Sequence, residues 1–514
     1  MPIIRIRYIE EKGGHHVQEQ QTFGAPIESM SALVQMFQKS KDFIRFRPKD
    51  INPQIIISFF RTLINEETLH RDVLPYMPTS EILSFHDLKA VLPIEAMEIT
   101  DNVEQISSKV LNGYAMIEID GDHAFCLLVS LCNKEGRQIS VPEIEYNVVG
   151  PQEAFVELLD INLNLLRRRL PTPYLQVEEL EIGSLSHTRV AVTFIDGIAN
   201  EENIQHVLDK LRNIEIDHIQ DSSYLIRAIE DNPNSLFPQS INTERPDRVA
   251  GVLAEGKIAI FVNGSPFAIT LPTTFVEFFA AVDDYNLPWL MATTFRLLRG
   301  FAVLFSMLAT PLYVAVLTYH YELIPKELLK TLIVSRSKIP FPPVIEALFL
   351  EVVIELLREA GARLPSKVAL TVGIVGGIVI GQAAVAASLT SNILIIIVAL
   401  SALASFTTPI YKIGNALRLT RFPFILSAQF LGMFGIISFS LFLLTHLVRA
   451  KSLGRPYLAP FYPTRLADWK DSIIRLPLST FSERPITARA RYRNRFDKEK
   501  VKRQKEKTKS DFDE

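Results

Sequence analysis

Four glutamates within one largely apolar stretch, which also contains Arg358, are the residues whose type and spacing point to chemistry. Glu346, Glu351, Glu355 and Glu359 lie within residues 344–360. At about 100° per residue this segment forms a helix with one broad apolar face, with Glu346 within that face and the other three glutamates opposite. Carboxylates at membrane depth typically mark an ion path, whereas on a helix lying in the membrane surface they carry no such meaning. The sequence leaves both interpretations open.

In a symmetric oligomer, one glutamate per chain becomes an acidic ring that concentrates cations. Glu351 and Glu355 are therefore candidates for lining an ion path. Gln382, a polar side chain within a later apolar run, is a third candidate, although hydrogen bonding to a neighbouring helix is the commoner role for such a residue. On this hypothesis, Glu351→Gln is expected to lower cation flux without disrupting assembly.

The longest uncharged run predicts membrane insertion. Val368–Tyr411 contains 44 residues without a charged side chain, and a bilayer core about 30 Å thick requires about 20 apolar residues per helix. We therefore predict two spans joined by a turn at Ser388–Asn392. Gly373, Gly377 and Gly381 follow a four-residue spacing that strips one helix face to backbone, so another helix can approach closely. That helix belongs either to another subunit of an assembly or to the same chain.

The first 290 residues predict two α/β subdomains of similar plan. Each contains a helical stretch followed by two apolar strands around a hairpin turn, at Asp120-Gly121 and at Asn263-Gly264. The sequences VLNGYAMIEIDG and VLAEGKIAIFVNG match with one residue of slippage. We also expect helices at Asn52–Ile64 and Pro151–Leu170. The second ends in the basic triplet RRR, for which a solvated helix end is preferred over binding of anions or lipid headgroups.

The predicted fold is an α/β N-terminal region of two similar subdomains, followed by an α-helical polytopic membrane domain and a basic disordered tail. The expected segments are a weakly patterned stretch at 1–40, subdomains at 41–150 and 151–290, a transmembrane domain at 291–450 and a C-terminal cytoplasmic segment at 451–514.

Four membrane spans are preferred over five. They are expected at about 300–319, 368–388, 392–411 and 422–448. The amphipathic helix at 344–360 is left out of the count, because its glutamates suit lipid poorly. Four spans place the basic tail on the cytoplasmic side with the N-terminal domain, where it suits anionic lipid, but they leave two basic loops outside, which the positive-inside rule disfavours.

The remaining composition argues against an enzyme and against a secreted disulfide-bonded protein. The chain has 514 residues and two cysteines within an apolar strand pattern. No zinc-ligand spacing, phosphate-cradling loop or nucleophile elbow is present, and the N-terminus lacks a signal-peptide apolar region. The glycines of GIVGGIVIGQ lie in a bilayer-length run rather than after a strand, so they do not form a dinucleotide site. We expect no catalytic residue, metal, cofactor or nucleic-acid partner.

Several motifs in order resemble the A subunits of GerA-type spore germination receptors. They are GPQEAFVELLDINLNLLRRRL (150–170), TERPDRVAGVLAEGKIAIFVNGSPFAITLP (243–272), PFPPVIEALFLEVVIELLREAGARLP (340–365), GIVGGIVIGQAAV (373–385) and SLGRPYLAPFYP (452–463). The resemblance extends from about residue 142 to residue 478 and does not include residues 1–40 or the tail after residue 484.

The resemblance implies a multi-pass protein of the spore inner membrane, with its N-terminal domain cytoplasmic. It also implies a transporter-like B subunit and a lipoprotein C subunit as partners, and a homo-oligomeric ring with a cation-conducting pore that opens when nutrient binds. Two alternatives remain: a non-conducting scaffold that couples the other subunits, and a paralogue that amplifies germination alongside the dipicolinic-acid release proteins. A secondary transporter is disfavoured, since no inverted repeat is found among these spans.

Overall fold

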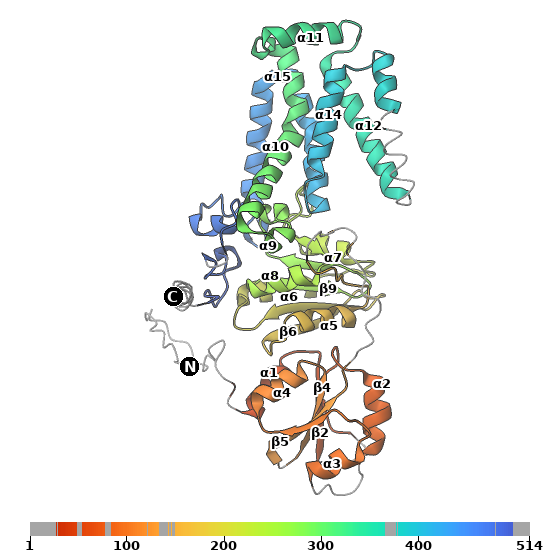
Figure 1. The fold of residues 1–514 in the computed structure, drawn as a ribbon, viewed down its shortest axis with the longest axis vertical. Helices are drawn as coiled ribbons and strands as arrows, with labels where there is room; N and C mark the ends of the chain where they lie inside the picture. The colour runs from red at the N-terminus through yellow and green to blue at the C-terminus, as the bar shows by residue number, and fades with distance from the viewer. Residues whose placement is uncertain are drawn as a thin grey trace, which may run out of the picture.

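The computed structural model consists of two sheet domains and a helical bundle stacked along the long axis of the molecule (Figure 1). The described residues are 27, 29–48, 54–77, 84–120, 122–132, 142, 145, 150–364, 377, 379–477 and 480–496.

The first sheet domain is a five-stranded antiparallel sheet with helices on both faces. Its strand order is β1-β2-β4-β5-β3. The strands are β1 (Phe43–Phe46), β2 (Ile55–Phe60), β3 (Met97–Thr100), β4 (Tyr114–Ile119) and β5 (Asp122–Ser130). The helices are α1 (Met30–Gln38), α2 (Glu66–Thr68, extended by a π turn at Leu69–Val73 and a 3-10 turn at Leu74–Tyr76), α3 (Phe85–Val91) and α4 (Val103–Val110). One core packs α1 and α4 against the sheet, and the other packs α3 and the π turn against the opposite face.

The second sheet domain has the same strand order, β6-β7-β9-β10-β8. Its strands are β6 (Leu175–Ile182), β7 (Thr188–Ile195), β8 (Ile241–Thr243), β9 (Ile258–Val262) and β10 (Ala268–Leu271). Its helices are α5 (Leu159–Arg169), α6 (Glu201–Arg212), α7 (Ser222–Ile229) and α8 (Pro246–Ala254). Helices α5 and α8 pack on one face of this sheet through one hydrophobic core, and α6 and α7 pack on the other face through a second core.

The predicted pair of similar α/β subdomains is confirmed at the level of connectivity. In both domains a helix precedes two strands, two helices precede the third strand, and one helix precedes a final hairpin. The hairpins are β4–β5 and β9–β10, and both occupy the same place in the strand order. Gly264 in the second turn has φ of +89°, a conformation that glycine adopts without strain.

Two local predictions are wrong. The segment expected to form a helix at Asn52–Ile64 contains strand β2, whose six residues are all buried. A continuous apolar run does not distinguish a buried strand from a helix, and the three β-branched isoleucines at 55–57 favour the strand in the middle of a sheet. The helix expected at Pro151–Leu170 begins only at Leu159, after eight residues without regular secondary structure.

The expectation that Arg167 is solvated is also wrong, because this residue joins the two sheet domains. Its side chain is 1% exposed, and its Nε and Nη2 donate to the two carboxylate oxygens of Asp42 at 2.7 and 2.6 Å. The guanidinium also lies 4.1 Å from the centre of the Phe60 ring. Burial alone raises the pKa of Asp42. The charge of Arg167 and the hydrogen bonds donated by Arg167, Ser40 and Thr62 outweigh this effect and hold the pKa below its ordinary value.

The helical bundle begins directly after the second sheet. A 3-10 turn (Phe275–Phe279) and α9 (Asp283–Asn286) lead into the bundle. Its helices are α10 (Trp289–Tyr319), α11 (Lys326–Arg336, after a 3-10 turn at Tyr321–Leu323), α12 (Pro343–Arg363), α14 (Asn392–Ser405) and α15 (Tyr411–Arg449). Among the described residues, α10 and α15 are long and apolar enough to cross a membrane by length and composition. The predicted turn is present, because Ser388 has φ of +56° and Ser391 caps the N-terminus of α14.

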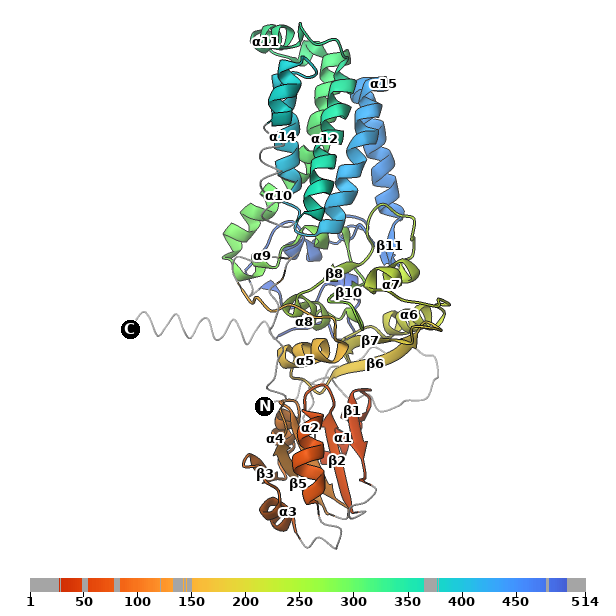
Figure 2. The same ribbon diagram turned by 90° about the vertical axis from the view of Figure 1, so that its right-hand side faces the viewer.

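Helix α15 folds back on itself at Gly432. This residue has non-helical angles of φ +59° and ψ −137°. The rings of Phe424 and Phe439 lie 4.6 Å apart, whereas fifteen residues of straight helix rise about 22 Å. The predicted last span, 422–448, therefore comprises parts of two antiparallel arms, visible as the paired blue ribbons in Figure 2. The two glycines of this apolar run, Gly432 and Gly435, give no sequence signal for such a reversal.

The chain after α15 returns to the second sheet domain. It forms a short hairpin of β11 (Lys451–Ser452) and β12 (Arg455–Pro456), followed by 3-10 turns at Leu466–Asp471 and Ile486–Ala488. The Ser452 hydroxyl donates to the Gln239 carbonyl at 2.6 Å, and the Arg455 guanidinium contacts Glu202 on α6 at 3.0 Å. The described residues of this segment, 451–477 and 480–496, and the sheet domains therefore lie at the same end of the bundle.

Candidate functional site

The candidate ion-path glutamates lie on α12, which runs alongside α10 and α14 rather than apart from the bundle (Figures 1 and 2). The Glu351 carboxylate is buried and accepts hydrogen bonds from Thr310 Oγ1 of α10 at 2.9 Å and Arg421 Nη1 of α15 at 3.2 Å. Both members of the Glu351–Arg421 pair are 2% exposed at the side chain. Glu351 is thus an internal partner of its own chain.

Glu355 lies one helical turn further along α12 and joins a second ion pair. Its Oε1 accepts from Arg418 Nε at 3.1 Å and from Arg358 Nη1 at 3.4 Å. Arg358 also donates to Ser405 Oγ of α14 at 3.1 Å, and its guanidinium lies 4.6 Å from the ring centre of Phe406. One third of the Glu355 side chain is exposed, so this carboxylate, unlike that of Glu351, reaches the surface of the chain.

These five residues form what we call the charge ladder: Glu351, Glu355 and Arg358 of α12, with Arg418 and Arg421 of α15. The ladder contains three guanidinium groups and two carboxylates, so its formal charge is positive. Removing one partner of a buried ion pair typically costs about 3–5 kcal/mol, because it leaves an uncompensated charge. The ladder therefore fixes α12 against α15.

The ladder also contains buried polar atoms without partners. Among the described residues, Arg421 Nε, Arg358 Nε and the nearby Ser401 Oγ make no hydrogen bond. Each such atom costs about 1–3 kcal/mol relative to a satisfied one. The observed pairing therefore leaves part of the hydrogen-bonding capacity of these groups unused.

Glu346 occupies a separate site near the start of α12. Its carboxylate is fully buried, and accepts from Arg336 Nη2 at 2.8 Å and from the Ser391 backbone N–H at 3.2 Å. The Ser391 hydroxyl in turn lies 2.9 Å from the Tyr313 hydroxyl. The apolar position of Glu346 on the predicted helix is thus explained by its ion pair with the partly exposed Arg336 of α11. This pair and the contacts of Ser391 link the ends of α10, α11, α12 and α14.

Gln382 and the glycines do not join the ladder. Gln382 and Gly377 are exposed and Gly381 is partly exposed. A Cβ added to Gly377 or Gly381 would meet no atom within 4 Å, so no described part of the chain packs on these two positions. Gly373 lies outside the described residues.

A buried ionic cluster joins the bundle to the sheet domain and the C-terminal segment. Arg296 and Arg299 precede the predicted span at 300–319, and both lie within α10. Asp284 of α9 accepts from Arg296 Nε at 3.0 Å and from Arg299 Nη1 at 3.1 Å. Asp471 accepts from Arg296 Nη1 at 3.0 Å. These ion pairs therefore fix α10 to α9, which follows the second sheet domain, and to the C-terminal segment.

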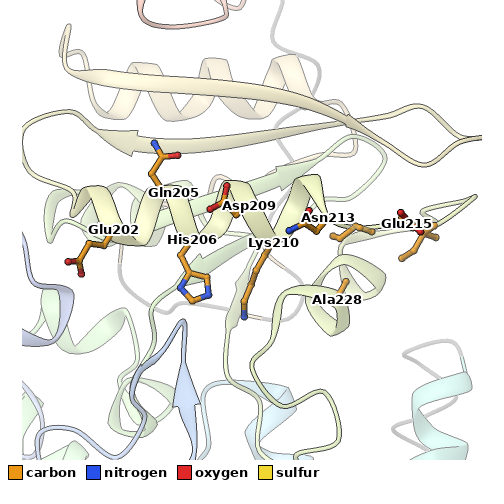
Figure 3. A pocket seen from close by; sticks show the side chains of 10 residues that line it. Glu202, Gln205, His206, Asp209, Lys210, Asn213, Glu215 and Ala228 are labelled. Carbon is orange, nitrogen blue, oxygen red and sulfur yellow. The ribbon is translucent and has the colours of Figure 1, made fainter.

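One surface hollow lies along α6 of the second sheet domain (Figure 3). Two of its charged side chains are paired within the chain: Lys210 donates to Asp231 at 2.5 Å, and Glu202 contacts Arg455 at 3.0 Å. His206 is the one histidine that lines it, and serine and cysteine are absent from the lining. These residues do not bring a nucleophile and a base together.

The chain matches known proteins over most of its length. The family described as Bacillus/Clostridium GerA spore germination protein matches residues 31–487. Spore germination protein GerQA of Bacillus cereus is 61% identical over 487 residues, covering 95% of this chain and 98% of that protein. GerIA of Bacillus cereus is 49% identical over 91% of this chain and 70% of that protein. Spore germination protein A1 of Bacillus subtilis (strain 168) is 38% identical over 90% of this chain and 96% of that protein.

Among solved structures, the N-terminal domain of the A subunit of the Bacillus megaterium spore germinant receptor GerK3 matches with 26% identity. The match covers 48% of this chain and 94% of that chain, with a TM-score of 0.34.

Proposed function

The chain belongs to the GerA family of spore germination proteins, and from this membership we propose that it is the A subunit of a nutrient germinant receptor. Relatives carrying spore germination names cover nearly the whole chain, and this match is the observation that carries the proposal. The subunit acts with a transporter-like B subunit and a lipoprotein C subunit in the spore inner membrane.

The bundle is the multi-pass membrane domain in this proposal, and the sheet domains are cytoplasmic. Support comes from two helices of membrane-crossing length and composition, and from residues 451–496, which bind the second sheet domain. Since the N-terminal domain and this C-terminal segment lie at one end of the bundle, both face the same side. The two arms of α15 cross the bilayer in opposite directions.

We further propose that the bundle conducts cations when the receptor is activated. Charged side chains at membrane depth are costly and usually functional, and the ladder places five of them within the bundle. Glu355 and Gln382 are exposed enough to face an ion path in an assembly. Glu351 takes part only after it is released from Arg421, so its pairing corresponds to a closed state.

A homo-oligomeric ring is the proposed form of the conducting assembly. The open positions at Gly377 and Gly381, which continue the spacing from Gly373, support a contact with a neighbouring subunit. The described part of the chain offers no helix to fill this face, whereas a second copy would.

The test is potassium efflux from liposomes containing the purified chain, with and without its B and C partners. Nutrient-dependent efflux that requires all three subunits supports the receptor-channel proposal. Glu355→Gln is expected to reduce this efflux, and Glu359→Gln serves as its matched control, since Glu359 is exposed and pairs only with Arg363 among the described residues. Equal efflux from the two variants excludes Glu355 from the ion path.

One observation favours a second function, that of a non-conducting scaffold. The ladder glutamates are neutralised by arginines of the same chain, and the arginines are in excess, so a ladder that never opens repels cations. In that case the junction of Asp284, Arg296 and Asp471 transmits the signal between subunits mechanically. A verified intact complex that passes no potassium under any nutrient condition favours the scaffold.

A further inference from the structure

Helix α11 lies across the end of the bundle farthest from the sheet domains (Figures 1 and 2). It has eleven residues, none of them buried, and at 1.5 Å per residue it is about 16 Å long, too short to cross a bilayer. Its two flanking segments join it to the end of α10 and the start of α12. The bond between Arg336 and the buried Glu346 fixes it to the bundle.

The side chains of α11 are sorted into an apolar arc and a polar arc. At about 100° per residue, Leu328, Leu329, Leu332 and Ile333 fall within an arc of ~140°. Leu332 in the middle of this arc packs against the bundle core. Leu328 and Ile333 at its edges are 57% and 61% exposed. These two side chains therefore extend past the bundle on either side, at the depth of the helix ends.

The polar arc contains Lys326, Glu327, Lys330 and Thr331, all exposed. Val334 is the apolar exception on this side and is also exposed. Two further features match a bilayer boundary: the exposed Tyr319 and Tyr321 lie where α10 ends, and tyrosines are enriched at that depth.

We propose that α11 is a membrane-interface helix that rests in the leaflet opposite the sheet domains. Leu328 and Ile333 enter the boundary between headgroups and acyl chains, and the lysines of the polar arc reach lipid phosphates. Lipid is the favoured occupant because the apolar edges flank a helix that is fixed at the end of membrane-length helices, where the bilayer surface lies. The proposal rests on the membrane location given under the proposed function.

The test places single tryptophans on α11 of the full chain in liposomes, after Trp289 and Trp469 are replaced by phenylalanine. Leu328→Trp is expected to be quenched by lipids brominated near the headgroup and to show a several-fold lower quenching constant with aqueous iodide than Val334→Trp. The Val334 variant is the matched control, because it also replaces an exposed aliphatic residue, but on the polar arc. Ile333→Trp on the other edge should behave as Leu328→Trp does.

A third tryptophan separates this inference from the membrane proposal itself. Leu304 of α10 is 59% exposed within the apolar part of that helix, and Leu304→Trp should be quenched by lipids brominated deep in the acyl chain. If Leu304→Trp is quenched and the Leu328 and Val334 variants are equally open to iodide, the bundle is inserted and α11 is not at the interface. If Leu304→Trp is not quenched, the membrane location fails, and the inference fails with it.

Discussion

Replacing Glu351 by glutamine tests whether this residue is structural or part of an ion path. The substitution keeps the shape of the side chain and the hydrogen bond from Thr310, but it removes the charge that faces Arg421. Arg421 is 1% exposed and its other contact is the Ser401 carbonyl. Its guanidinium is therefore left buried without a counter-charge.

The expected cost follows from this burial. Breaking a buried ion pair by removing one partner costs about 3–5 kcal/mol. For a unit of about 150 residues or more, 1 kcal/mol shifts the melting temperature by about 2–4 °C. We therefore expect Glu351→Gln to lower the melting temperature of the detergent-solubilised chain by about 6–20 °C. This replaces the expectation from sequence alone that the variant assembles normally.

The assay is a double-mutant cycle with Glu351→Gln, Arg421→Met and the combined variant, measured by thermal unfolding and by potassium efflux. Replacing both partners removes the unpaired charge, so the double variant should recover most of the lost stability. Glu359→Gln is the control for a surface pair, worth about 0.2–1 kcal/mol. A melting temperature of Glu351→Gln within about 1 °C of the unmodified chain refutes the buried-pair argument. Efflux restored in the double variant removes Glu351 from the ion path.

Three further predictions concern other parts of the chain. Asp42→Asn should lower the free energy of unfolding by about 3–5 kcal/mol at neutral pH, because Arg167 is left buried and unpaired. Since the pKa of Asp42 is lowered in the folded chain, the stability that its carboxylate contributes is complete above about pH 4, the pKa of an unfolded aspartate, and is lost as the pH falls through the folded-state pKa. The free energies of unfolding of the variant and the unmodified chain, measured in urea, should therefore converge in acid. A difference that persists in acid contradicts this prediction. Gly432→Ala should destabilise the bundle by about 1–3 kcal/mol in thermal unfolding, because φ is positive and the new Cβ lies 2.9 Å from His320 Nε2. Gly381→Leu should leave unfolding of the monomer unchanged but reduce the oligomer mass in native mass spectrometry, and an unchanged mass removes this face from assembly.

Local sequence signals predicted the hairpins and their repetition, because Asp-Gly and Asn-Gly turns act within a few residues. Strand β2 was missed for the opposite reason. Its burial on both faces removes the alternation that identifies a strand, and neighbouring strands β1 and β4 decide its conformation. Similarly, the RRR triplet reads as a solvated helix end until Asp42, 125 residues away, supplies a buried partner for Arg167.

The glutamates of the candidate site were found from sequence, but their orientation was not. Glu351 and its partner Arg421 are 70 residues apart, and periodicity within α12 reports only which residues share a face. A signal was present in the connector before the last predicted span. Arg418 and Arg421 are three residues apart, a spacing that places them on one face of a helix. Glu351 and Glu355 are four residues apart and also share one helix face. Matching the two patterns requires knowing that α12 and α15 are neighbours.

The buried pairing bears directly on how a germination signal would open the proposed ion path. Moving a two-state equilibrium from 1:99 to 99:1 requires about 5.5 kcal/mol of differential binding. Breaking one buried ion pair costs about 3–5 kcal/mol. New hydrogen bonds to the unpaired polar atoms of Arg421, Arg358 and Ser401 would offset part of this cost. Opening one pair of the ladder is therefore within the range that ligand binding supplies. Opening all of its pairs at once is not, so a gate built on the ladder has to exchange partners rather than expose them.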